Sequence, residues 1–188
     1  YRTCIEMYEK LEDTVALANS HRRLGALMYA ESADYDLATK HHFESARLYK
    51  EARKWFEYGR QLNYIAFIYM EVGQLDVAKR YLDDAQEIEN SIKSVPLEAC
   101  NKKHLGIYFR RLGDYEQSIT YYEDAIDLYN ELGDKWQEMI CLKNIATAYF
   151  YLGNIDTTIQ FLRTALRIAR AINVSKSDMN FLHHSKEP

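Results

Sequence analysis

Histidine and cysteine side chains could bind a metal ion or take part in catalysis, but their spacing in this sequence favours neither role. The histidines of His41-His42 and of His183-His184 are adjacent, whereas two histidines must lie three or four residues apart to share one face of a helix. The cysteines Cys4, Cys100 and Cys141 include no pair separated by two residues, so we interpret them as reduced thiols. The sequence therefore predicts no metal site.

Motifs for catalysis and for cofactor binding are missing as well. The sequence contains neither a Gly-x-Ser-x-Gly motif nor a His-Glu-x-x-His motif, which are typical of serine hydrolases and zinc peptidases. A phosphate-binding loop requires closely spaced glycines, but the seven glycines are spread along the chain at predicted helix contacts and turns. We therefore predict that the protein is not an enzyme and binds no cofactor.

The composition is that of a folded, mainly helical protein. Of the 188 residues, 47% are hydrophobic, 28% are charged and only two are proline. The net charge of −4 argues against broad nucleic-acid binding, because that requires a concentrated basic surface. No apolar run is long enough to cross a bilayer and no secretory signal is visible, so we expect a cytoplasmic protein with no membrane contact in this fragment. The sequence begins at Tyr1 without a methionine, and we expect it to be part of a longer chain.

A repeat of 40 residues organises the elements that must position any site. Small residues recur at Ala26, Ala66, Gly106 and Ala146, and the same step links the aromatic residues Tyr29, Tyr69, Phe109 and Tyr149. Other positions keep the step too, small in one set and large in another. Such internal self-similarity is typical of solenoids built from stacked supersecondary units.

Each unit contains two helical segments, because apolar residues recur at spacings of three and four on both sides of a turn. Gly113-Asp114 shows the turn chemistry, since glycine ends one helix and aspartate caps the next. The first unit fits better with a one-residue insertion near Ser32-Ala33. The sequence thus predicts an all-α fold of four antiparallel hairpins, with helices at 14–31, 34–51, 56–71, 74–91, 96–112, 114–131, 135–151 and 154–173.

We expect a single domain over 1–188, in which the four full repeats occupy 14–173. Residues 1–10 are predicted to end a preceding helix, and 174–188 to form a partial or frayed capping helix. The last full helix has apolar residues on more than one side, although an end repeat normally needs a polar cap. Either Met179 to Leu182 covers it, or more repeats follow, or two copies associate through their terminal helices.

The spacing of small and aromatic residues resembles the tetratricopeptide repeat (TPR). The segments that carry the resemblance are Leu105-Gly106-Ile107-Tyr108-Phe109 and Ile145-Ala146-Thr147-Ala148-Tyr149, with the turns that follow them. The unit is longer than the common 34 residues, and in this it is similar to repeats of bacterial signalling and transcription regulators and of kinesin light chains. The resemblance implies a right-handed α-solenoid that acts as a protein–protein interaction module or scaffold.

The same resemblance implies where a partner would bind. In this family the first helix of every hairpin lines the concave face, and we expect the residues there to lie outside the core. Their mixture of basic and aromatic side chains predicts a groove for an acidic peptide of a partner protein. The predicted binding positions are Arg23, Arg60, Asn63, Phe67, Met70, Lys103, Ile107, Arg110, Arg111, Lys143, Phe150 and Tyr151.

Three alternatives remain open. The basic side chains could simply be solvated on an exposed helical face, with Phe67 and Phe150 covering the seams between repeats. Asn63 and Asn144 could hold a peptide backbone through their amides, as in sensors that resemble bacterial peptide-pheromone receptors. The domain could also be the sensory or regulatory part of a larger bacterial signalling protein or transcription regulator.

Overall fold

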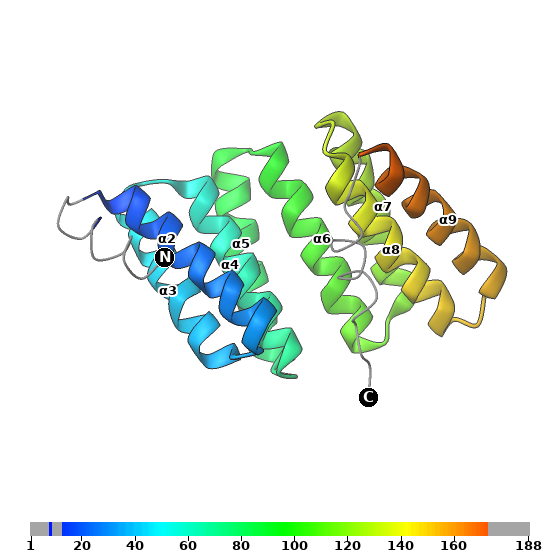
Figure 1. The fold of residues 1–188 in the computed structure, drawn as a ribbon, viewed down its shortest axis with the longest axis horizontal. Helices are drawn as coiled ribbons and strands as arrows, with labels where there is room; N and C mark the ends of the chain where they lie inside the picture. Colours follow the sequence, from blue (N-terminus) through cyan, green and yellow to red (C-terminus); the bar gives the residue numbers. More distant parts are fainter. Residues whose placement is uncertain (1–7, 9–12, 173–188) are drawn as a thin grey trace.

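The computed structural model describes Tyr8 and residues 13–172, which form helices joined by short turns and contain no strand. Their helices pair into antiparallel hairpins that lie side by side along the long axis of the molecule (Figure 1). The predicted all-α solenoid of stacked hairpins is therefore confirmed. The helices are α2 (Thr14–Leu27) with the π-helical turn η1 (Met28–Ser32), α3 (Tyr35–Glu51), α4 (Trp55–Glu71), α5 (Leu75–Ile92), α6 (Val95–Leu112), α7 (Tyr115–Glu131), α8 (Lys135–Tyr151) and α9 (Ile155–Ala171).

The helix boundaries follow from the turn residues identified in the sequence. Gly113 ends α6 in the left-handed conformation, with φ of 82°, which a residue without a Cβ adopts at no steric cost. Asp114 then caps α7, because its Oδ1 accepts a hydrogen bond from the Gln117 backbone N–H at 3.0 Å. The predictions for 1–10, apart from the helical Tyr8, and for 174–188 concern residues outside the described part of the chain.

The extra residue expected near Ser32-Ala33 is present as a π-helical turn. The start of α2 and the start of α3 are one residue further apart than the starts of α4 and α5. The turn at Met28–Ser32 absorbs this residue, and Ala33 closes it in the left-handed conformation, with φ of 49°. A π-turn is the usual way in which a helix accommodates a single insertion, and it rotates the residues around it.

Within the later hairpins the paired helices are joined by stacked aromatic rings at equivalent positions. Tyr69 stacks on Tyr81 with ring centroids 5.6 Å apart, and Phe109 stacks on Tyr121 at 5.1 Å. In the first hairpin Tyr29 does not stack on His41, the equivalent residue of α3. It lies tilted against Tyr35 at the start of α3 and, edge-on at 5.3 Å, against Phe67 of α4.

Glycines on the first helix of a hairpin leave room for a ring on the second helix. A Cβ added at Gly106 would lie 2.7 Å from the buried Tyr122 ring. At Gly25 it would lie 2.9 Å from the His42 ring. Glycine thus stands where a ring from the second helix packs directly on the backbone of the first.

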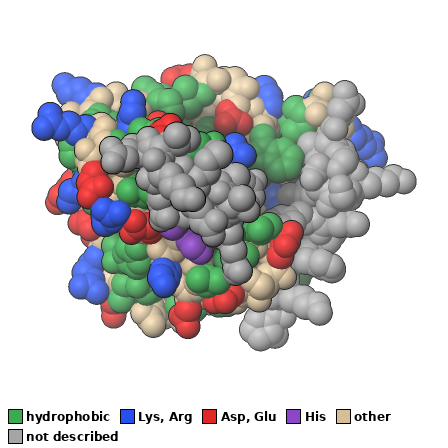
Figure 2. Space-filling view, turned by 60° about the vertical axis from the view of Figure 1, so that its left-hand side comes forward, with side chains coloured by type: hydrophobic (Ala, Val, Ile, Leu, Met, Phe, Trp, Pro, Cys, Tyr) green, Lys and Arg blue, Asp and Glu red, His purple; other side chains and the backbone are tan. Residues whose placement is uncertain are grey.

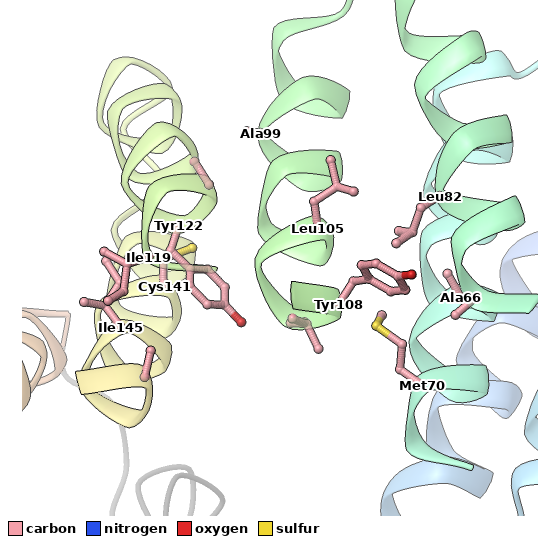
Figure 3. Packing of buried hydrophobic residues seen from close by; sticks show 14 of the residues in the cluster. Ala66, Met70, Leu82, Ala99, Leu105, Tyr108, Ile119, Tyr122, Cys141 and Ile145 are labelled. Atoms are coloured by element: carbon pink, nitrogen blue, oxygen red, sulfur yellow. The ribbon is translucent and has the colours of Figure 1, made fainter. Parts of the chain in front are cut away.

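The main core runs through α4 to α8. Tyr108 points from α6 towards Met70 and Leu82, while Tyr122 points from α7 towards α6 (Figure 3). Because side chains from three successive hairpins meet in this cluster, the repeats are packed into one continuous core.

Candidate binding surface

The first helices of successive hairpins form one layer of the solenoid. Helix α4 packs closely against α6, and α6 touches α8 less extensively. The second helix of each hairpin contacts the first helix of the next hairpin: α3 contacts α4, α5 contacts α6 and α7 contacts α8. All predicted binding positions therefore come from one layer, α2, α4, α6 and α8 with its C-terminal end.

Buried amide side chains close the seam between α4 and α6. The Asn63 Nδ2 group donates a hydrogen bond to Asn101 Oδ1, and Asn101 Nδ2 donates to the Ala85 carbonyl oxygen at 3.2 Å. On the same helix Gln61 Oε1 lies 2.9 Å from His42 Nδ1. Because these side chains are almost completely buried, they join neighbouring hairpins rather than present amides to a ligand.

Four predicted positions do not lie outside the core, and for these the prediction is wrong. Asn63, Met70, Lys103 and Ile107 have exposed fractions of 0%, 2%, 9% and 8%. Met70 and Ile107 belong to the main core cluster, and the Lys103 ammonium donates to Gln137 Oε1 at 3.0 Å, which ties α6 to α8. The physical reason is the close approach of the inner helices, which covers positions that the repeat spacing alone leaves open.

A neutral histidine is buried in the same seam. The His104 Nδ1 atom lies 2.7 Å from the Cys100 carbonyl oxygen and donates a hydrogen bond to it. Burial, together with the charges of Lys103 and Arg60, lowers the pKa of His104 to about 3. Burial also raises the pKa of the Cys100 thiol. At neutral pH both groups are thus uncharged packing groups.

An aromatic cluster covers the inner layer around α4. Phe67 lies edge-on to Tyr29 at 5.3 Å and edge-on to His104 at 6.4 Å, measured between ring centroids. Tyr64 lies edge-on to His104 at 6.0 Å and stacks on His42 at 5.5 Å. Tyr29, Tyr64 and Phe67 are only partly buried, so this aromatic cluster presents apolar area to the outside.

Basic side chains also occur on α2, α4 and α6. Arg23 on α2 is exposed, and the Arg60 guanidinium lies 5.5 Å from the centroid of the Phe56 ring. Arg111 pairs with Glu71 at 2.5 Å across the ends of α6 and α4. Arg111 is therefore already partnered, whereas Arg23 contributes charge to the surface.

A second group of cations lies between α6 and α8. Lys143 is half-buried, and both burial and the nearby Arg110 charge lower its pKa. Arg110 is half-buried as well. A cation that is partly withdrawn from water gains from an anion placed beside it.

The layer ends in exposed aromatic residues on α8. Phe150 and Tyr151 have exposed fractions of 57% and 39%. Their rings meet edge-on at 5.8 Å, and Tyr151 stacks on Tyr115 at 5.1 Å. This end of the layer therefore offers apolar contact area on the same helix as Lys143.

The face formed by the early hairpins shows no sorting of charge. On the end of the molecule formed by the early hairpins, acidic and basic side chains alternate with hydrophobic ones (Figure 2). No group of three or more His, Cys, Asp or Glu residues in the described part of the chain could hold a metal ion. None of the described helices combines the length and the apolar character that crossing a lipid bilayer requires.

A family model identifies the repeats. The model of the tetratricopeptide repeat matches residues 60–131 and 97–171, which together exceed half of the chain. The chain belongs to the TPR family. No curated protein sequence is significantly similar to it.

Solved TPR-like structures share the fold at low sequence identity. BtubC (BKLC) from P. vanneervenii is 18% identical, with a TM-score of 0.64 over 86% of this chain and 66% of that one. A Rap protein complexed with competence and sporulation factor is 16% identical, with a TM-score of 0.68 over 87% of this chain and 44% of that one. Aspartyl phosphate phosphatase F from Bacillus subtilis is 16% identical, with a TM-score of 0.70 over 89% and 44%. The chain thus spans less than two thirds of the length of each.

The predicted binding positions did not include three aromatic contributors to the inner layer, namely Tyr29, Tyr64 and His104. Tyr29 follows the repeat as a stacking residue, but the π-turn redirects it towards Phe67. The insertion near Ser32-Ala33 was the available signal, because one extra residue rotates a helix face by about 100°. Tyr64 and His104 carried no such signal, since their contact depends on how closely α4 and α6 approach.

Proposed function

We propose that the inner layer of α2, α4, α6 and α8 is a groove that binds an acidic peptide segment of a partner protein. The observation that carries the proposal is that this layer presents the half-buried cations Arg110 and Lys143 together with the exposed ring of Phe150. A carboxylate beside these cations would form charge-assisted hydrogen bonds. Phe150 and the aromatic cluster around Phe67 would supply apolar contact on either side.

The fold supports this type of function. TPR proteins generally act as non-catalytic modules for protein–protein interaction, and one structural neighbour is a Rap protein in complex with competence and sporulation factor. The alternative function is the sensory or regulatory domain of a larger signalling protein, in which the same groove would receive the signal. Self-association would involve a different surface, on α9.

The test is binding of fluorescein-labelled twelve-residue peptides that combine Asp and Glu with one Phe, measured by anisotropy at low and high salt. We expect Arg110→Glu with Lys143→Glu to weaken binding by at least about 10-fold, since two attractive contacts become repulsive. The matched control is Lys40→Glu with Arg80→Glu, which makes the same charge change at exposed positions of α3 and α5.

An equal loss in both double variants would show that only net charge matters and would overturn the groove. The proposal would also be overturned if the wild-type protein bound neutral peptides as tightly as acidic ones, or bound neither. Thermal melts of all variants show whether a loss of binding comes from unfolding.

A further inference from the structure

The outer face of α9 carries a continuous apolar stripe. Ile155, Ile159, Leu162 and Leu166 have exposed fractions of 50%, 40%, 45% and 41%. Their spacing of four, three and four residues places them along one side of the helix. Scattered exposed apolar residues are ordinary, but a contiguous stripe marks a contact surface.

The repeat shows what kind of element fits this stripe. One period earlier the equivalent positions on α7 are Tyr115, Ile119, Tyr122 and Ile126. There Ile119 and Tyr122 are buried, with exposed fractions of 7% and 0%, and α7 packs between α6 and α8. The stripe of α9 therefore occupies a position that elsewhere in the molecule is closed by helix packing.

The stripe has the spacing of a coiled-coil seam. Ile159 and Leu166 fit the a positions of a heptad, and Ile155 and Leu162 fit the d positions. Asp156 and Arg163 then follow the d positions directly and flank the seam on one side, and both are exposed. The natural occupant is thus another helix with apolar residues at the same spacing and with charges that complement the acidic and the basic residue on this flank.

We propose that the occupant is α9 of a second copy of this chain, packed antiparallel about a two-fold axis. In this arrangement Ile159 meets Leu162 of the partner subunit, and Ile155 meets Leu166 of the partner subunit. Asp156 then lies within about one helical turn of Arg163 of the partner subunit, and the symmetry repeats this pair. The two helix dipoles oppose each other, which also favours the antiparallel arrangement.

Charge favours this orientation over the parallel one. In a parallel pair the flank that holds Asp156 and Arg163 faces the opposite flank of the other helix, which here holds Thr158 and Ala165. No pair of opposite charges forms there. In the antiparallel pair the flank that holds Asp156 and Arg163 faces the same flank of the second copy. Each Asp156 therefore meets Arg163 of the partner subunit. The interface consists of little more than one helix per copy, so we expect a weak dimer.

The experiment is sedimentation equilibrium of the 188-residue chain from about 5 µM to about 1 mM, a range suited to a weak interface. The wild-type protein should shift from monomer to dimer. Ile159→Lys should abolish this shift, because it places two ammonium groups in the seam. Asp156→Arg alone and Arg163→Asp alone should each weaken dimerisation by about 10-fold, since both symmetric pairs become like-charged.

The combination Asp156→Arg with Arg163→Asp distinguishes this geometry from nonspecific hydrophobic association. It exchanges the charges of both pairs, so dimerisation should return to within about 3-fold of wild type. The control Arg167→Asp alters charge beside the seam without touching a pair and should have a smaller effect than Arg163→Asp.

Three results would overturn the proposal: a strictly monomeric wild-type protein, dimerisation that survives Ile159→Lys, or a double exchange no better than the single variants. If residues 173–188 or another protein cover the stripe instead, the first of these results is obtained. Circular dichroism melts establish that each variant is folded, because all the altered side chains are exposed.

Discussion

The hairpins α6–α7 and α8–α9 carry the same pattern one period apart, yet their second helices lie in different environments. Tyr122 on α7 is fully buried, whereas its counterpart Leu162 on α9 is 45% exposed. Ile119 and Ile159 differ in the same way. The comparison teaches that the repeat pattern fixes which side chains face a neighbouring helix, while the presence of that neighbour decides how much they stabilise the fold.

The two hairpins also show how volume is conserved within a repeat. Gly106 on α6 accommodates the Tyr122 ring, with no room for a Cβ. At the equivalent places α8 carries Ala146 and α9 carries Leu162. The smaller residue on the first helix thus accompanies the larger one on the second, as close packing of paired helices requires.

Side-chain truncation should give the largest difference in stability between the two hairpins. We expect Tyr122→Ala to lower the free energy of unfolding by about 3–5 kcal/mol, because it leaves a cavity against Gly106 in a closed core. Leu162→Ala should cost less than about 1 kcal/mol at low protein concentration, since the side chain is largely in water already. Urea unfolding of both variants measures the difference. Equal losses would mean that the α9 stripe is covered in the monomer.

Overpacking gives a second, smaller contrast. Ala125 on α7 and Ala165 on α9 are equivalent and have exposed fractions of 0% and 7%. Ala125→Leu should destabilise by about 1–3 kcal/mol, because α7 is packed between α6 and α8 and cannot move away. Ala165→Leu should cost less, since α9 can shift outwards. The shift in thermal midpoint measures both, and an unchanged midpoint for Ala125→Leu would contradict its placement.

Much of the fold was predictable because local rules repeat. Helix boundaries followed from capping chemistry, as at Gly113 and Asp114, and agree with the prediction within a few residues. The insertion in the first repeat was detectable as a loss of register, and the structure resolves it as a π-turn at Met28–Ser32. These features depend on residues close in sequence, which is why one sequence suffices to locate them.

The binding layer was less predictable because it depends on distances between repeats. Periodicity placed Asn63 and Ile107 on a free face, but the approach of α4 to α6 buries them. The same approach brings His104 against Tyr64 and Phe67. Spacing along the chain carries no information on how far apart two hairpins stack, so the accessible part of a solenoid surface must come from the structure.

The pH dependence of stability should differ between the early hairpins and the last one. Buried histidines occur on α3 and α6, whereas α8 and α9 contain no histidine. Burial lowers the pKa values of His42 and His104 from the ordinary 6.5, that of His104 to about 3. Below pH 6.5 the histidines of the unfolded chain therefore bind protons that those of the folded chain do not. The free energy of unfolding decreases as the pH falls through this range.

Between pH 7 and pH 5.5 the loss should be about 1 kcal/mol from His104 alone. The variant His104→Phe keeps a ring against Tyr64 and Phe67 but cannot titrate, so its stability should vary less with pH by that amount. Urea unfolding midpoints at pH 7, 6.25 and 5.5 test this above the range in which carboxylates titrate. Parallel pH profiles for the wild type and the variant would show that His104 is accessible to protons in the folded state, and hence that the α4–α6 seam opens readily.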